Sequence, residues 1–193
     1  MIDFVALLLI NTMAGYVLLA WYVYAGIAEP DQRKWAPGFV VAGLVALLFG
    51  GYLVLTWPLP GSYNSAYGEM SVLFGVLLLS AGVVMARGGS LLTLAGYAFF
   101  AGLVAVELGI RFVVLDLSKS PLLTGLGLVV SGMGGVLAAP GLIWFKNNRA
   151  LRVVVAIMLL GAAGIWAVVG YGAYWMHMKA FMDLGVHGLP STK

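Results

Sequence analysis

Apolar residues run along this chain in six long stretches that are separated by short polar segments. The stretches cover about residues 4–27, 36–57, 69–86, 90–115, 122–145 and 151–176. At about 1.5 Å per residue, helices of these lengths match a hydrocarbon core of about 30 Å. The pattern therefore predicts an all-α, polytopic integral membrane protein with six transmembrane helices in a single domain over residues 1–193.

The fourth stretch differs from the others because two charged residues, Glu107 and Arg111, interrupt its apolar pattern. Thr93 and Tyr97 fall on the same predicted helix face as this pair. The acid precedes the base by four residues, which is the favourable order for an ion pair within one helix. Charged side chains in hydrocarbon are costly and usually face protein or water. We therefore expect a central helix whose charged face points toward a polar interior.

Small residues lie on roughly the opposite face of the same predicted helix, at Ala101, Ala105 and Gly109. Such a ridge allows a second helix to approach closely. Asn11 lies in the first stretch at a depth similar to that of Glu107. The candidate solute path consists of Glu107, Arg111, Asn11, Tyr97 and Thr93. The alternative is a purely structural charged pair that fixes helix packing.

Composition supports the membrane class and narrows the chemistry. Of 193 residues, 63% are hydrophobic and 9% are charged, and the mean hydropathy is +1.05, which excludes a soluble domain. The chain contains no cysteine, so disulfides, thiolate metal sites and iron–sulfur clusters are excluded. No nucleophile–base pair, phosphate loop or zinc motif is visible, and no basic run suggests nucleic acid. We therefore expect neither an enzyme nor a cofactor.

Positive charges are distributed unevenly between the two predicted sides of the membrane. One side carries Arg33, Lys34, Arg87, Lys146, Arg149 and Arg152. The other side carries Lys119, Lys179 and Lys193. Lys and Arg concentrate in cytoplasmic loops. This asymmetry predicts a multi-pass protein of a prokaryotic cytoplasmic membrane, with its N and C termini outside.

The longest connection between stretches lies on the predicted outer side, at residues 57–69. Its candidate site residues are Trp57, Tyr63, Asn64, Tyr67 and Glu69. Long loops are functional more often than short ones, and Pro, Gly, Ser and Asn exclude a continuous helix here. We expect this loop to fold over the outer mouth of the bundle. The alternative is an ordered surface loop without a further role.

The last predicted helix ends in residues that resemble soft-metal ligands. They are Met176, His177, Met178, Asp183 and His187. Thioether and imidazole groups suit copper(I). Their spacing matches no standard site, so no metal centre is expected, and copper handling at the outer face remains only an alternative.

The run WPLPGSYNSAYGEMSVLFG resembles an uncharacterised family of small prokaryotic six-helix membrane proteins, and the likeness covers nearly the whole chain. Tyr67-Gly68, Leu73-Phe74-Gly75 and the run EPDQRKWAPGFVVAGL also resemble, more weakly, the AmiS/UreI family of urea and amide channels. That second resemblance implies six spans, outer termini and hexameric rings with one pore in each protomer. The pore tryptophans of the fifth helix in that family are absent here before Trp144.

These observations lead to three functional hypotheses. The first is a membrane channel or facilitator for a small polar solute, with a path past Glu107 and Arg111 that the 57–69 loop caps. The second is a non-transporting membrane subunit or scaffold, and the third is copper handling by the tail. The expected partners are the lipid bilayer, a small polar solute and further copies of the chain, without nucleic acid.

Overall fold

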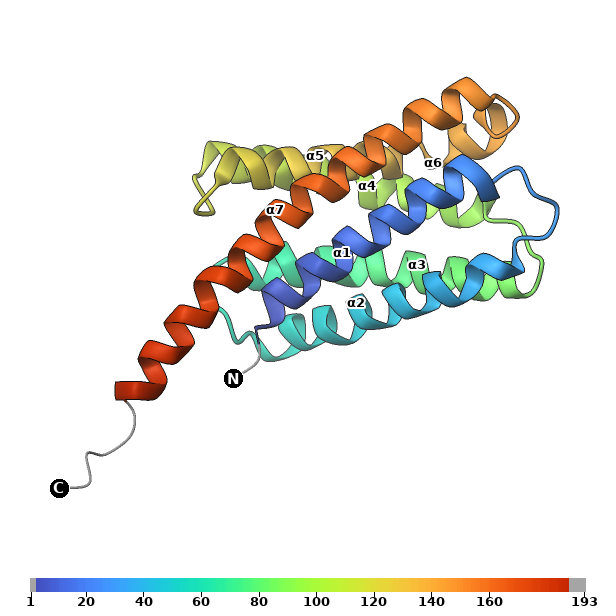
Figure 1. Cartoon of the computed structure of the whole chain (residues 1–193). Helices are drawn as coiled ribbons and strands as arrows, with labels where there is room; N and C mark the ends of the chain where they lie inside the picture. Colours follow the sequence, from blue (N-terminus) through green and yellow to red (C-terminus); the bar gives the residue numbers. More distant parts are fainter. Residues whose placement is uncertain (1–2, 188–193) are drawn as a thin grey trace.

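The computed structural model describes residues 3–187, which form a bundle of long helices without a strand (Figure 1). The helices are α1 (Phe4–Trp21) with η1 (Tyr22–Gly26), η2 (Arg33–Trp35) with α2 (Ala36–Thr56), η3 (Asn64–Glu69) with α3 (Met70–Ala86), α4 (Leu92–Val114), α5 (Pro121–Val136), α6 (Ala138–Pro140) with η4 (Gly141–Phe145), and α7 (Arg149–His187). Five spans are long and apolar enough to cross a membrane, and a bent pair makes a sixth. The prediction of an all-α chain with apolar, membrane-type helices is confirmed.

Two helices differ from the predicted stretches. The fifth is bent by 45° between α5 and α6. Pro140 lies just after the bend, and it cannot donate a backbone hydrogen bond to the preceding turn. The last helix ends at His187 instead of near residue 176. Residues 177–184 are polar enough to end a membrane span, but they contain no Gly or Pro that would end a helix.

The helices form a ring made of three antiparallel pairs (Figure 1). The pairs are α2 with α3, α4 with α5, and α1 with α7. Contacts between α1 and α2 and between α5 and α7 join these pairs to one another. The contact between α3 and α4 is less extensive than the contact between any other two neighbouring helices of the ring. The ring therefore has one weak side.

Glycines bring α2 and α3 into backbone contact. A Cβ atom added at Gly75 would lie 2.6 Å from the backbone nitrogen of Leu47, and one at Gly43 would collide with the backbone of Leu79. The glycines of this contact recur every seventh residue. They are Gly43 and Gly50 on α2, and Gly68, Gly75 and Gly82 on the facing segment. Such contacts replace apolar burial as the source of stability when helices meet in lipid.

Glycines also bring α4 and α5 into backbone contact. A Cβ atom at Gly102 would lie 2.5 Å from the carbonyl oxygen of Gly132, and one at Gly109 would lie 2.7 Å from that of Gly125. The spacing is again seven residues on each helix. Of the predicted small-residue ridge, only Gly109 belongs to this contact, because Ala101 and Ala105 face the interior of the ring.

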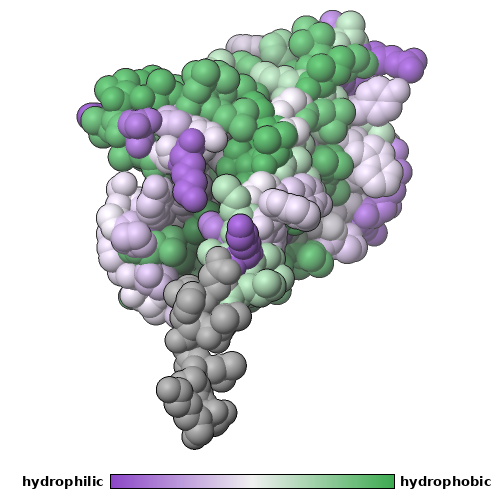
Figure 2. All heavy atoms as spheres, turned by 60° about the vertical axis from the view of Figure 1, so that its left-hand side comes forward, coloured by the Kyte–Doolittle hydropathy of each residue, from purple (hydrophilic) through white to green (hydrophobic). Residues whose placement is uncertain are grey.

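The two ends of the bundle differ in charge. At one end, here named the basic end, loop 27–35 meets the turn 87–91 and the segment 142–146. At the other, the terminal end, the Nδ1 atom of His177 lies 2.6 Å from a carboxylate oxygen of Asp3, beside the start of α1. The alternation of loops between ends follows the prediction. Apolar side chains cover much of the surface between the ends, and hydrophilic ones form separate patches (Figure 2).

Candidate functional site: a central cavity with a basic end

A cavity of about 290 Å³ lies inside the ring, close to the lower limit of the range of about 300–1,000 Å³ for ligand pockets. Residues from all the long helices line it, and nearly all of them are apolar. On α4 the wall consists of small side chains, including Ala98, Ala101 and Ala105. The wall also contains larger residues, such as Phe74 and Leu78 of α3. The cavity therefore exists where the alanines of α4 leave space.

Three polar side chains of the wall form one cluster, namely Tyr16, Ser131 and Trp166. The indole nitrogen of Trp166 on α7 donates to the hydroxyl of Ser131 on α5, at 3.0 Å. The side chain of Tyr16 on α1 also interacts with Ser131. This cluster joins three helices and leaves no free polar group of its own in the cavity. The middle of the cavity therefore suits hydrocarbon better than water.

Segment 57–69 contributes Ala66 and Tyr67 to the cavity wall at the terminal end. Tyr67 lines the cavity, and its ring meets that of Phe112 edge-on at 5.8 Å and stacks with that of Tyr63 at 6.0 Å. The fully buried Asn64 side chain accepts from the backbone nitrogen of Leu59 at 3.0 Å and donates to the carbonyl of the same residue. Asn64 therefore holds the loop in the shape that seats Tyr67.

Two cationic side chains, Lys146 and Arg152, lie in the wall at the basic end. The Nε atom of Arg152 is buried and has no hydrogen-bond partner within residues 3–187. Beyond them a polar cleft of about 580 Å³ adjoins the cavity and shares Tyr22, Met85 and Lys146 with it. A ligand that extends along the cavity would therefore meet positive charge at this end.

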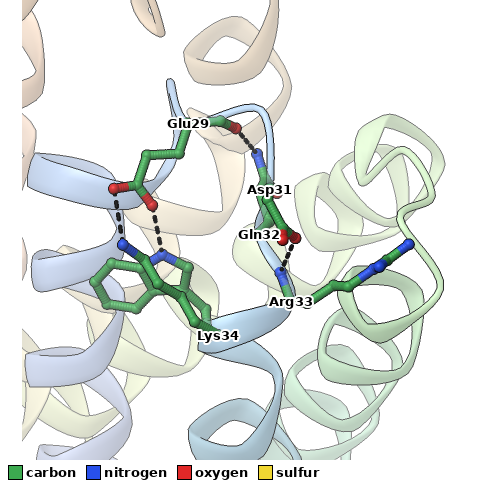
Figure 3. Close-up of polar contacts among 6 residues, drawn as sticks. Glu29, Asp31, Gln32, Arg33 and Lys34 are labelled. Atoms are coloured by element: carbon green, nitrogen blue, oxygen red, sulfur yellow. Dashed lines mark hydrogen bonds and ion pairs between the residues drawn. The ribbon is translucent and has the colours of Figure 1, made fainter.

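The loop from α1 to α2 shapes the polar cleft. Glu29 accepts hydrogen bonds from Lys34, at 2.9 Å, and from the indole of Trp35, at 3.3 Å (Figure 3). These bonds hold the pKa of the Glu29 carboxyl below its usual range. The hydroxyl of Tyr22, at the border of the cavity, donates to Gln32 at 2.8 Å. The loop is therefore fixed at several points.

Arg33 belongs to the same loop but points elsewhere. Its side chain extends away from the Glu29 cluster (Figure 3), and its guanidinium lies near Gly88 in the turn between α3 and α4. Arg33 lines the polar cleft together with Asp31, whose carboxylate accepts from the backbone nitrogen of Arg33 at 3.0 Å. In the part of the chain that the structure describes, no salt bridge engages this guanidinium.

The residues predicted for a solute path do not meet inside the bundle. Thr93, Tyr97, Glu107 and Arg111 share one face of α4, as predicted, but all four are exposed on its outer side. No ion pair joins Glu107 to Arg111 among residues 3–187. The prediction that this face turns toward a polar interior is therefore wrong for the single chain. Their role in a solute path stays a prediction.

The fifth predicted path residue, Asn11, has a structural contact. Its side-chain nitrogen donates to the backbone carbonyl of Ala42 on α2, at 2.9 Å. An amide in an apolar layer needs such a partner, and here it links α1 to α2. The amide therefore contributes to helix packing and lies away from the residues on the outer face of α4.

The residues of the predicted loop site separate into two groups. Asn64 is buried, and Tyr63 and Tyr67 are partly buried at the terminal end of the cavity. Trp57 and Glu69 are exposed, and Trp57 ends α2 with a left-handed φ of 50°. Of this loop, only Ala66 and Tyr67 line the cavity among the described residues, and its role as a cap stays a prediction.

The residues considered as copper ligands are also dispersed. His177 binds Asp3, whereas Met176 and Met178 are exposed. The side chains of Asp183 and His187 lie outside the described residues. Among the residues that the structure describes, no group of three or more His, Cys, Asp or Glu side chains could hold a metal ion.

Sequence reasoning missed the role of Lys146 and Arg152 in the cavity. In the sequence they indicate only an orientation in the membrane. Lys146 directly follows segment 141–145, which continues the chain after the 45° bend, and Arg152 lies in the first turns of α7. Pro140 was the available signal, because proline within an apolar stretch often bends a helix.

The fold and the cavity define a class: helical proteins whose long, membrane-type apolar helices enclose an apolar chamber with a positively charged end. Within this class, the chain belongs to the family DUF981, described as a protein of unknown function, and the match covers residues 1–180. The prediction of an uncharacterised family is confirmed. No curated protein and no solved structure matches significantly, so the resemblance to AmiS/UreI channels is not supported.

Proposed function

We propose that this protein binds an amphiphilic lipid inside the membrane, with the hydrocarbon part in the central cavity and an acidic head group at the basic end. The observation that carries this proposal is the combination in one site of an apolar cavity and two cationic side chains, Lys146 and Arg152, that form no salt bridge within residues 3–187. Neither an apolar solute nor a free ion would use both parts of such a site.

The cavity wall favours a hydrocarbon chain as the buried part of the ligand. A polar solute inside an apolar wall loses its water and finds few hydrogen-bond partners, which costs several kcal/mol. The middle of this wall presents side chains such as Leu78 and Ala101, and Ser131 is already bonded. A flexible alkyl chain loses nothing by the same transfer.

The basic end favours a carboxylate or phosphate as the head group. Guanidinium groups bind both anions with paired hydrogen bonds, and lysine binds them as a point charge. Arg152 and Lys146 line the inner part of this end, and Arg33 lines the adjoining cleft. The head group would satisfy the buried Nε atom of Arg152.

The side of the ring between α3 and α4 provides a route by which the lipid enters the cavity. Because α3 and α4 contact one another loosely, a lipid can enter the cavity sideways from the bilayer between them. Leu73 and Leu77 of α3 and Leu94 of α4 border the cavity on this side. Sideways entry keeps the hydrocarbon chain out of water throughout.

The proposed function includes a membrane in which the protein lies and an orientation across that membrane. The membrane is the prokaryotic cytoplasmic membrane, and the basic end faces the cytoplasm because that end carries most of the Lys and Arg residues. The acidic head group would then lie near the cytoplasmic surface. The solute channel past Glu107 and Arg111 is less favoured, because both side chains face away from the cavity.

The test uses a photoactivatable fatty acid as the probe, on protein purified in detergent. Ala101→Phe should fill the cavity and abolish labelling. Leu103→Phe is the matched control on the same helix, because Leu103 is 47% exposed on the outer side. Equal labelling of both variants would overturn the cavity as the site.

A second comparison tests the head group with the corresponding photoactivatable fatty alcohol. The wild type should label more strongly with the acid than with the alcohol. Arg152→Gln should remove this preference, whereas Arg149→Gln, at an exposed arginine one turn earlier on α7, should keep it. A preference that survives Arg152→Gln would contradict the role of the basic end.

A further inference from the structure

The outer face of α4 carries a stripe of exposed residues. Its members are Thr93, Tyr97, Phe100, Val104, Glu107 and Arg111. Phe100 is 69% exposed and Tyr97 is 50% exposed. Exposed apolar residues are normal for a helix in lipid, but the two charges are not. The stripe therefore needs an explanation beyond lipid contact.

The depth of Glu107 makes its exposure costly. Glu107 lies seven residues before the end of α4 at Val114, which corresponds to about 10 Å along the helix. A charge at such a depth in hydrocarbon requires a partner or water, and insertion scales put the cost near 3 kcal/mol. No hydrogen bond or salt bridge engages its carboxylate within residues 3–187.

We propose that the α4 stripe binds the α4 stripe of a second copy of this chain. Charge complementarity identifies the occupant, since the stripe carries one acid and one base four residues apart. In a twofold dimer about the membrane normal, the Glu107 carboxylate of each copy faces the Arg111 guanidinium of the other. The two positions differ by about 6 Å in height, which an extended arginine side chain spans.

The rest of the stripe fits the same arrangement. Phe100 and Val104 lie on the same face, about two turns and one turn before Glu107, and would pack across the twofold axis. An ordinary lipid would leave Glu107 without a cation. An ion pair within one helix would leave both charged side chains exposed to lipid. A second copy satisfies both charges and covers the aromatic residues.

The first experiment is cysteine cross-linking in native membranes, which is specific because the chain contains no cysteine. Val104→Cys should form an oxidised dimer across the axis. Ile157→Cys is the matched control, since Ile157 is 63% exposed on α7 and lies outside the stripe. A dimer band for Ile157→Cys equal to that for Val104→Cys, or none for either, would overturn the proposal.

The second experiment distinguishes pairing between copies from pairing within one helix. Chains with Glu107→Arg and chains with Arg111→Glu carry different affinity tags. Each variant alone should lose self-association, whereas co-expression should restore copurification, because each copy then supplies the charge that the other lacks. Copurification of each variant with itself, or no recovery in the mixture, would contradict the proposal.

The two experiments cover the case in which a charge reversal prevents folding, because Val104→Cys leaves both charges in place. They are also independent of the proposed lipid site. A monomer that still labels with the fatty acid probe would overturn the dimer alone, and a dimer that does not label would overturn the lipid site alone.

Discussion

Ser131 occupies the point where α1, α5 and α7 meet in the cavity wall. Its hydroxyl accepts the hydrogen bond of the Trp166 indole, which is 3% exposed. Ser131→Ala leaves that N–H group without an acceptor, and such a loss typically costs about 1–3 kcal/mol. We expect a lower free energy of unfolding in detergent. Ser62→Ala, at an exposed loop serine, is the control and should change stability little.

Glu29 gives the molecule a pH dependence at the basic end. The hydrogen bonds from Lys34 and Trp35 lower its pKa in the folded state, so the folded protein favours the ionised form. This contribution is present above the pKa of the unfolded chain, and it is lost as the pH falls through the lower folded-state pKa. Glu29→Gln should therefore reduce thermal stability near pH 7.

The same variant should lose its disadvantage in acid. Below the folded-state pKa, wild type and Glu29→Gln both carry a neutral side chain, so their melting temperatures should converge. Melting curves from pH 7 down to pH 3 check this expectation. A constant difference at every pH would mean that the ionised carboxylate contributes nothing.

For individual residues, the sequence predicted which side chains share one face of α4. It did not predict whether that face points into the ring or away from it. Thr93, Tyr97, Glu107 and Arg111 do form one stripe, because helical periodicity is visible in a sequence. Turning that stripe inward assumed that charges avoid lipid within a single chain. A second chain would satisfy the same physical requirement, and a single sequence carries no direct sign of it.

Among the elements, the α4–α5 pair is the clearest case of packing that a single methyl group would disturb. A Cβ atom at Gly102 would lie 2.5 Å from a carbonyl oxygen of the facing backbone, which cannot move away easily. Overpacking of this kind typically costs about 1–3 kcal/mol. We expect Gly102→Ala to lower the melting temperature in detergent and to weaken the α4–α5 contact.

Gly96 provides the control on the same helix. An added Cβ atom there meets nothing within 4 Å, and alanine favours helix over glycine by up to about 1 kcal/mol. Gly96→Ala should therefore be neutral or stabilising. If Gly102→Ala were equally harmless, the close approach of α4 and α5 would not hold in the protein.

The position of the helix contact could be predicted from sequence only approximately. Small residues at Ala101, Ala105 and Gly109 suggested a ridge, and the actual contact uses Gly102 and Gly109. Because small residues stand next to one another in the sequence, two different faces of α4 were equally plausible as the contact with another helix. The choice between them depends on the glycines of α5, and only the assembled pair reveals that Ala101 and Ala105 border a cavity.

For the whole molecule, the charge difference between the two ends leads to a topology test. Ser62 lies at the terminal end and Asn147 at the basic end, and both are exposed. In intact cells, Ser62→Cys should react with a membrane-impermeant thiol reagent, whereas Asn147→Cys should react only after permeabilisation. The reverse labelling pattern would invert the proposed orientation and place the basic end outside.

The number of helices and their alternation between two ends could be predicted because long apolar stretches and polar connections are local features. The 45° bend, the 39-residue length of α7 and the cavity could not. Each of these depends on which residues meet across the ring. The cavity in particular depends on the small side chains of Ala98, Ala101 and Ala105. It also depends on which residues, distant in sequence, surround them in the fold.

The seven-residue spacing of the glycines has a consequence for handedness. Seven residues fall about 20° short of two full turns of an ideal helix. Gly68, Gly75 and Gly82 can all remain against α2 only if the two helices wind around each other in a left-handed sense. The α4–α5 pair has the same spacing and therefore the same winding.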